Sequence, residues 1–250
     1  MEKIKVGVCG ANGRMGREVV AAVKADSALE LVAKIDIVNG EFGTIAQACE
    51  KNKIDVLIDF TQPASIFENA KYCLNHNIKA VIGTTGLKDS QIEELKALSE
   101  KNNVACLIAP NFSTGAVLMM MFAKTAAKYF DNAEIIEFHH NQKKDAPSGT
   151  AIKTALMMSE AKESFKTGNC AETETIEGSR GGSSYSDIQI HSVRMPGYMA
   201  SQEVIFGAMG QTLKIRHDSS DRKCYMPGVV MAAKYVAQHN EFVYGLENIL

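Results

Sequence analysis

The feature that most constrains the fold is a regular alternation of short apolar runs with longer amphipathic stretches over the first 110 residues. The apolar runs are almost continuous, as expected of strands in a parallel sheet whose two faces are both covered by helices. The pattern predicts a doubly wound, Rossmann-like α/β domain. Its expected strands are Ile4–Cys9, Leu29–Ile35, Asp55–Phe60, Lys79–Ile82 and Val104–Ile108, and its expected helices are Arg14–Ala25, Pro63–Asn75 and Ser90–Lys101.

The rhythm changes near Pro110, and two later β-rich runs follow one another without an intervening helix, which indicates a second, α+β domain. A last helix from about Val229 to Gln238 resembles those of the first domain, so we expect domains of residues 1–112 with 221–250 and of residues 113–220. The second domain is expected to contain helices over Thr114–Tyr129 and from about Ser148, strands over Glu134–His140, Ile188–Arg194 and Glu203–His217, and a polar loop over Lys166–Asp187.

Composition excludes several classes of function. The net charge is -2 and no polybasic stretch occurs, which argues against a nucleic-acid partner. The most apolar stretch, Ala116 to Ala123, is too short to span a bilayer, and the chain opens without secretory-peptide features, so we expect no membrane partner and a cytoplasmic location. The six cysteines form no CxxC pair, and we expect no metal site.

A glycine-rich turn joins the first expected strand to the first expected helix. Glycines permit a tight turn and close approach of the backbone to a pyrophosphate, which the N–H groups at the start of the helix can then bind. Asp36 ends the second expected strand, where a carboxylate can accept hydrogen bonds from ribose hydroxyls. These features predict dinucleotide binding by Gly10, Ala11, Asn12, Gly13, Arg14, Met15 and Asp36.

Two further loops follow expected strands at their carboxyl ends. Ligands of open α/β sheets bind beyond these ends, so both loops are expected to contact the cofactor. Their candidate residues are Gly83, Thr84, Thr85, Ala109, Pro110, Asn111 and Phe112.

The most informative segment runs from Glu137 to Thr150. Asp-Ala-Pro-Ser-Gly-Thr at its end indicates a helix start with a capping side chain and a proline in the first turn. The N–H groups there, with the Thr150 hydroxyl, form a candidate carboxylate site. His139 and Lys143 are candidate proton donors, but in an extended strand they would lie about 13 Å apart, at about 3.3 Å per residue. They serve one small substrate only if the chain bends after His140.

The motifs together resemble the 4-hydroxy-tetrahydrodipicolinate reductase family. Gly-Ala-Asn-Gly-Arg-Met-Gly, Gly-Thr-Thr-Gly, Ala-Pro-Asn-Phe-Ser and His-His-x-x-Lys-x-Asp-Ala-Pro-Ser-Gly-Thr occur in the order typical of that family, and the later strands around His191–Arg194 and Gly207–His217 are also similar. The resemblance implies a cofactor domain, a substrate and oligomerisation domain that forms a homotetramer, NADH or NADPH as reductant, a cyclic dicarboxylate substrate, and a place in diaminopimelate and lysine biosynthesis.

The resemblance also implies roles by position. Gly10 to Met15 match the pyrophosphate contacts and Asp36 the ribose acid, and the loops after Ile82 and Ile108 match further cofactor contacts. His139 matches the proton donor and acceptor and Lys143 the proton donor, while the substrate contacts are His140, Gly149 and Thr150.

The sequence departs from the family at two places. Ile37 stands where many members have arginine and offers no charge to a 2′-phosphate, so we expect NADH to serve at least as well as NADPH. A histidine common after the Arg194 strand has no counterpart in Ala200–Glu203, which leaves substrate contacts from that region open. Two alternatives also remain: an amine-forming dehydrogenase such as 2,4-diaminopentanoate dehydrogenase, and a non-catalytic dinucleotide-responsive binding protein.

Overall fold

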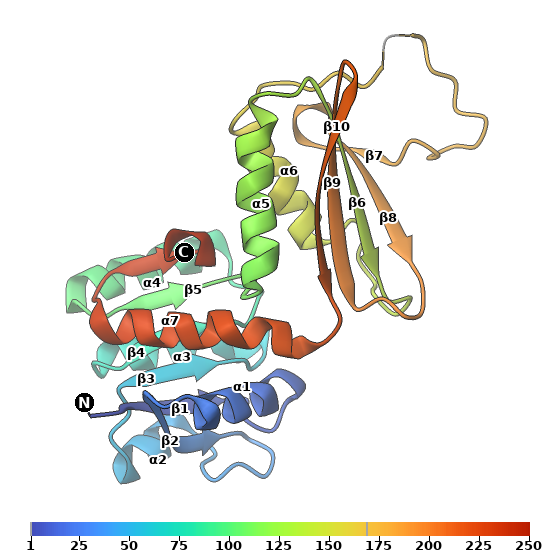
Figure 1. The fold of residues 1–250 in the computed structure, drawn as a ribbon. Coiled ribbons are helices and arrows are strands. Elements are labelled where there is room, and N and C mark those ends of the chain that lie inside the picture. Colours follow the sequence, from blue (N-terminus) through green and yellow to red (C-terminus); the bar gives the residue numbers. More distant parts are fainter. Residues whose placement is uncertain (1, 169) are drawn as a thin grey trace. The chain divides into compact units, whose positions relative to one another are not determined.

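The computed structural model describes residues 2–168 and 170–250, and the chain divides into two compact units. The first comprises residues 1–114 and 222–250, and the second comprises residues 115–221. Figure 1 shows a parallel sheet between helices in the first unit and a mixed sheet packed against helices in the second. The predicted class, a doubly wound sheet with a second α+β unit, is therefore confirmed.

The sheet of the first unit is parallel throughout, in the order β11-β5-β4-β3-β1-β2. The order reverses between β1 and β3, which is the switch point where such sheets bind ligands. The strands are β1 (Ile4–Cys9), β2 (Leu29–Ile35), β3 (Val56–Asp59), β4 (Lys79–Ile82), β5 (Cys106–Ile108) and β11 (Phe242–Tyr244).

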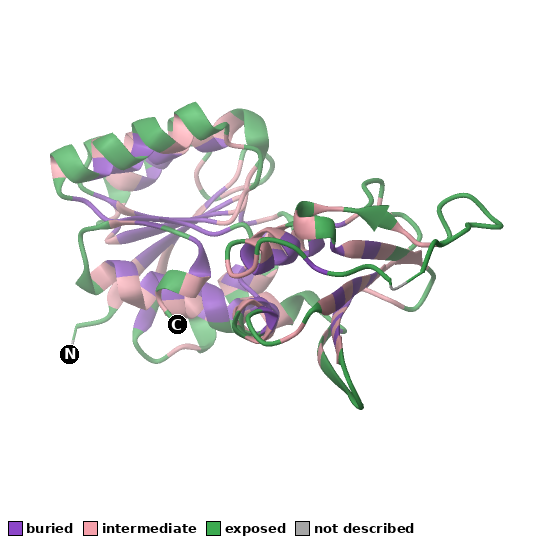
Figure 2. Cartoon of the chain, turned by 90° about the horizontal axis from the view of Figure 1, so that it is seen from above, coloured by how far each residue is buried: buried purple, intermediate pink, exposed green. Residues whose placement is uncertain are grey.

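Helices cover both faces of this sheet, as Figure 2 shows from above. Helices α1 and α7 pack together on one face, and α3 and α4 on the other, so alternate residues of each strand are buried in opposite directions. Cys9, Leu57 and Ile82 lie in the core beneath α3 and α4. The helices of this unit are α1 (Arg14–Ala25), α2 (Ile45–Lys51), α3 (Pro63–Asn75), α4 (Asp89–Asn102) and α7 (Met226–Gln238), with 3-10 turns η2 (Arg222–Tyr225) and η3 (Leu246–Asn248).

The second unit contains a mixed sheet in the order β10-β9-β6-β8-β7. Strands β6 and β8 are parallel, and the other pairs are antiparallel. A core that includes Ala127, Ile135, Met158 and Phe206 joins the sheet to helices α5 and α6 on one face. Its elements are α5 (Thr114–Ala127), β6 (Asn132–His139), α6 (Gly149–Ser159), β7 (Gly182–Ser183), a 3-10 turn η1 (Tyr185–Asp187), β8 (Gln189–Arg194), β9 (Ala200–Ala208) and β10 (Gln211–Ser219).

Several elements differ from the sequence-based expectation. The single run expected over Glu203–His217 is a hairpin of β9 and β10, because the chain reverses at Gly210, whose φ is 73°. The short elements α2 and β11 were not predicted. Pro147 precedes the helix cap Ser148 rather than lying in the first turn of α6, so that detail of the prediction was wrong. Among the described residues, the helices are all too short or too polar to cross a membrane.

Candidate functional site

In the glycine turn after β1, two positions have no space for a Cβ atom and therefore accept only glycine. Gly10 has a φ of 74°, and a Cβ on it would lie 2.5 Å from the carbonyl oxygen of Phe60. A Cβ on Gly16 would lie 1.9 Å from the carbonyl oxygen of Gly10. The turn therefore packs tightly against both the end of β3 and the first turn of α1.

The N–H groups of this turn divide into two sets. Gly10, Ala11 and Gly13 donate to backbone carbonyls at 2.9–3.3 Å, so their N–H groups hold the turn itself. Arg14 and Met15, at the start of α1, have no intrahelical acceptor, because the first N–H groups of any helix lack one. The first turn of α1 is thus the part that can bind an anion.

Asp36 lies beside the glycine turn. Its carboxylate accepts the N–H of Asn12 and the N–H of Val38, each at 2.9 Å, and the side chain of Asn12 donates to the carbonyl of Val38 at 2.8 Å. These bonds tie the end of β2 to the turn after β1. The next residue, Ile37, is 90% exposed and adds no charge.

The loops after β3, β4 and β5 meet at the same edge of the sheet. A Cβ on Gly83 would lie 2.2 Å from the ring of Phe60, and the rings of Phe60 and Phe112 have centroids 5.8 Å apart. Phe60 therefore connects the glycine turn with both predicted cofactor loops. Ala11, Ala109 and Phe112 are buried, so these three candidate residues also belong to the core under this edge of the sheet.

Asp59, at the end of β3, is a buried carboxylate that organises this edge. It accepts hydrogen bonds from Thr61, from Asn69 and from the hydroxyl of Thr84, at 2.7–3.1 Å. Burial raises the pKa of Asp59, and these hydrogen bonds offset the rise only in part. A pocket of about 130 Å³ adjoins the same loops and is lined by Thr84, Thr85, Gly86, Leu87, Ile92, Ile108, Ala109, Pro110 and Tyr244.

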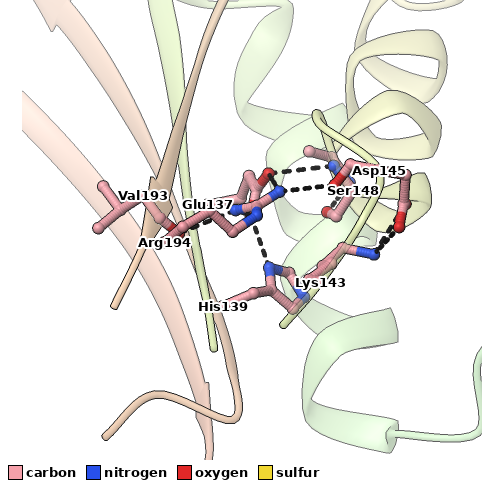
Figure 3. A network of polar contacts seen from close by, with 8 residues as sticks. Glu137, His139, Lys143, Asp145, Ser148, Val193 and Arg194 are labelled. Carbon is pink, nitrogen blue, oxygen red and sulfur yellow. Dashed lines mark hydrogen bonds and ion pairs between the residues drawn. The ribbon is translucent and has the colours of Figure 1, made fainter. Parts of the chain in front are cut away.

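In the second unit, His139 lies at the end of β6 beside a buried carboxylate (Figure 3). Glu137, fully buried, accepts from His139 Nδ1 at 2.5 Å and from the guanidinium of Arg194 at 2.7 and 2.8 Å. Burial alone would raise the pKa of Glu137, but hydrogen bonds from His139, Arg194 and Ser192 outweigh it and lower the pKa to about 2.

Lys143 follows a turn after β6. The chain therefore bends after His140, which is the condition under which His139 and Lys143 could serve one small substrate. The Lys143 N–H donates to the His140 carbonyl at 3.1 Å, which closes the turn. Its ammonium pairs with both carboxylate oxygens of Asp145, at 2.7 and 2.8 Å, and this contact lowers the pKa of Asp145. The Lys143 side chain is 19% exposed and that of Asp145 is 63% exposed, so this ion pair lies at the surface.

The start of α6 is capped by Ser148. Its hydroxyl accepts the N–H of Ala151 at 3.2 Å, while its own N–H donates to Glu137 at 3.1 Å. Gly149 is exposed, and a Cβ built on it would meet nothing within 4 Å, so there is open space beside this turn. The Thr150 carbonyl accepts the hydroxyl of Thr154, which in turn accepts from Gln202 at 2.7 Å.

Sequence reasoning missed the residues that support the predicted ones. Asp59 and Phe60 end a strand at the switch point, so their position alone was a usable signal. Glu137 lies on the buried face of β6, two residues after Ile135. A charged side chain on a buried face needs hydrogen-bond or ion-pair partners, so its position in the alternation was a signal. Within residues 2–168 and 170–250, the His, Cys, Asp and Glu side chains form no cluster suited to a metal ion.

Comparisons with known proteins give a consistent result. Family models described as dihydrodipicolinate reductase, N-terminus and C-terminus, match residues 4–112 and 115–250. The 4-hydroxy-tetrahydrodipicolinate reductase of Listeria innocua is 49% identical, over 99% of this chain and 100% of the relative. That of Picosynechococcus sp. is 44% identical, over 100% of this chain and 99% of the relative.

Solved structures agree. Dipicolinate-bound dihydrodipicolinate reductase from Paenisporosarcina sp. TG-14 has a TM-score of 0.93 and 44% identity, over 99% of this chain and 100% of that chain. D-galactose-1-dehydrogenase from Rhizobium etli, at 14% identity and a TM-score of 0.61 over 98% of both chains, shares the fold alone. Since the two family models together match nearly the whole chain and the relatives cover it end to end, this chain belongs to the dihydrodipicolinate reductase family.

Proposed function

We propose that this chain reduces 4-hydroxy-tetrahydrodipicolinate to tetrahydrodipicolinate with NADH or NADPH, in diaminopimelate and lysine biosynthesis. The observation that carries the proposal is the juxtaposition, in a chain of this family, of His139 and the N-terminus of α6, both bonded to the buried Glu137. The full-length matches favour this activity over an amine-forming dehydrogenase and over a non-catalytic binding protein.

The first unit fits a dinucleotide. Its glycine turn leaves no room for a side chain at Gly10 or Gly16, its α1 N-terminus has N–H groups for a pyrophosphate, and Asp36 keeps acceptor capacity for ribose hydroxyls. We assign the cofactor to Gly10–Met15, Asp36, Gly83–Thr85 and Ala109–Phe112. When bound, the cofactor supplies the hydride that adds at ring C4 of the dehydrated substrate.

The second unit supplies groups for the carboxylates and the protons. The relative from Paenisporosarcina binds dipicolinate, a dicarboxylate, and Gly149, Thr150 and His140 are assigned to such a group here. Lys143 Nζ acts as the acid that donates a proton, and His139 acts with it in proton transfer. Cationic and N–H groups around two carboxylates also stabilise charge that develops during reduction.

One assay tests the proposed function. The wild-type protein is mixed with enzymatically generated 4-hydroxy-tetrahydrodipicolinate, and oxidation of NADH or NADPH is followed by the loss of absorbance of the reduced nicotinamide. We expect turnover that requires both substrates. Binding of the cofactor with no turnover would contradict the proposal and favour the non-catalytic alternative.

The first prediction concerns the cofactor. We expect kcat/KM for NADH to equal or exceed that for NADPH, because a 2′-phosphate about 4 Å from the Asp36 carboxylate would be repelled by several kcal/mol unless a cation offset it. Replacing Ile37 with arginine should shift the ratio toward NADPH about tenfold or more, the scale of one charged hydrogen bond. Ile37→Gln, which adds length without charge, is the control. A wild-type preference for NADPH of tenfold or more, on the order of 1.4 kcal/mol, would contradict the assignment.

The second prediction concerns the start of α6. Thr150→Val keeps the branched shape and removes the hydroxyl, so it should lower kcat/KM about 10- to 150-fold, mainly through KM, if the hydroxyl binds a substrate carboxylate. Inhibition by pyridine-2,6-dicarboxylate should weaken in parallel, and NADH affinity should not change. Thr125→Val is the matched control, because the Thr125 hydroxyl is exposed and bonds to the Met121 carbonyl of its own helix. Unchanged KM and inhibition would show that this turn merely caps a helix.

We also propose a cytoplasmic homotetramer. Helices α5 and α6 cover one face of the second sheet, no other described helix of this unit covers its opposite face, and the edge strand β10 is largely exposed. An uncovered sheet face suits contact between identical subunits. Sedimentation velocity at micromolar concentration tests the subunit number.

A further inference from the structure

The buried carboxylate of Glu137 connects three segments of the second unit (Figure 3). One oxygen accepts from His139 Nδ1 and from Arg194, and the other accepts from Arg194 and from the Ser148 N–H. Arg194 also donates to the carbonyl of Asp145 at 2.9 Å. The end of β6, the end of β8 and the segment that leads into α6 are therefore joined through one side chain.

The fold places these groups together for simple reasons. Glu137 and His139 are two residues apart on a strand, so their side chains share a face. Arg194 is the direct partner of His139 in the parallel pairing of β6 with β8. The His139 ring is 15% exposed and Glu137 is fully buried, so the contact is shielded on one side and the ring still reaches solvent.

The carboxylate determines which ring nitrogen of His139 carries the proton. An ionised carboxylate accepts hydrogen bonds and cannot donate them, so the nitrogen that faces it must be N–H. In the neutral ring, Nδ1 is then protonated and Nε2 carries the lone pair. Nε2 is the atom that can take a proton from a substrate or return one to it.

We propose that Glu137 is a positioning residue for the reduction: it holds His139 as the Nδ1–H tautomer with Nε2 available for proton exchange, and it fixes the ring relative to the substrate-binding start of α6. This role rests on the proposed function of His139. Glu137 itself touches neither reactant.

A second glutamate on the same strand provides a matched control. Glu134 contacts His191 Nε2 at 2.8 Å and Arg180 at 2.7 Å, so it also lies between a histidine and an arginine. It sits three residues from Glu137, on the opposite face of the sheet, and its side chain is 36% exposed. Glu134→Gln removes the same charge away from the proposed site.

The first test reads the tautomer directly and needs no substrate. Long-range 1H–15N spectra of protein labelled with 15N-histidine distinguish Nδ1–H from Nε2–H, and the His139 signals are identified by their loss in His139→Asn. We expect Nδ1–H for neutral His139 in the wild type and in Glu134→Gln. We expect a mixture of tautomers or the Nε2–H form in Glu137→Gln. Wild-type His139 in the Nε2–H form would overturn the inference.

The second test is a double-mutant cycle on kcat. Glu137→Gln should lower kcat about 10- to 100-fold, the range known for outer partners that orient metal-ligating histidines, while NADH affinity stays unchanged. In the His139→Asn background, the same change should alter kcat by less than about threefold, because the ring on which Glu137 acts is absent. Equal losses in both backgrounds would overturn the inference.

Loss of the charge beside Arg194 can also destabilise the fold. Glu137→Asp keeps the charge but withdraws it by one methylene, so it should fold normally and still lower kcat several-fold with His139 present. No loss of kcat in Glu137→Asp and Glu137→Gln would overturn the role. Failure of the wild type to turn over substrate would overturn the proposed function instead, and the tautomer spectra distinguish the two failures.

Discussion

Replacing Lys143 with alanine is expected to lower kcat about 100- to 10,000-fold, the usual effect of removing a positioned general acid. The ammonium of Lys143 pairs with Asp145 in the segment that follows the turn after β6, the strand that ends at His139. NADH affinity, measured by calorimetry, should stay near that of the wild type, because Lys143 belongs to the second unit and the candidate cofactor residues to the first.

Lys162 provides the matched control for this variant. It also pairs with an aspartate, Asp131, at 2.7 Å, and its side chain is 24% exposed against 19% for Lys143. Lys162→Ala thus removes a similarly exposed ammonium that also pairs with an aspartate but lies outside the site, and it should leave kcat unchanged. A Lys143→Ala variant that keeps more than about a third of wild-type kcat would show that another group donates the proton, since the loss would fall far short of the general-acid range.

Replacing Gly16 with alanine is expected to weaken NADH binding by about 150- to 20,000-fold. The added Cβ would lie 1.9 Å from the carbonyl oxygen of Gly10 and 2.9 Å from the Cα of Ala11, so the turn and the first turn of α1 must move apart. Loss of two hydrogen bonds to charged phosphate corresponds to about 3–6 kcal/mol, which gives that range in Kd. Overpacking of this kind also destabilises a fold by about 1–3 kcal/mol.

The measurement compares NADH Kd by fluorescence titration with Tm by calorimetry. Gly207→Ala is the control, because a Cβ on Gly207 would meet only a side-chain atom of Asn132, at 3.8 Å. Tm for Gly16→Ala should fall by several degrees, at about 2–4 °C per kcal/mol for a chain of this size. Normal NADH affinity in a folded Gly16→Ala protein would place the cofactor elsewhere.

The first unit could be predicted closely because its strands are buried on both faces and its helices are amphipathic. Strands β1, β2 and β4 and helices α1 and α3 have the bounds that periodicity indicated. Strand β11 was missed because its three residues are held by pairing with β5 rather than by a pattern of their own. The hairpin of β9 and β10 was read as one strand because its turn consists of only Met209 and Gly210.

The candidate site was predictable in its local motifs and not in its long-range contacts. Residue type and spacing were enough to predict the glycine turn, Asp36 and the segment from His139 to Thr150. The pairing of β6 with β8 brings Arg194 to Glu137 across 57 positions of sequence, and no local pattern specifies that contact. The proposed roles of the site residues therefore stay predictions for the variants above.

The first unit is made of two separate parts of the sequence, with the second unit between them. During synthesis, the second unit is therefore translated before the first unit has all its residues. Helix α7 covers β3, β4 and β5, and β11 pairs with β5, yet both elements lie beyond residue 221. Ribosomes add about 5–20 residues per second, so the nascent strands wait on the order of 5–20 s for these partners while residues 115–221 are made. Until then the edge of β5 and the face awaiting α7 are exposed to chaperones and to other chains. The unit translated second is accordingly complete first, and the cofactor unit closes only after it.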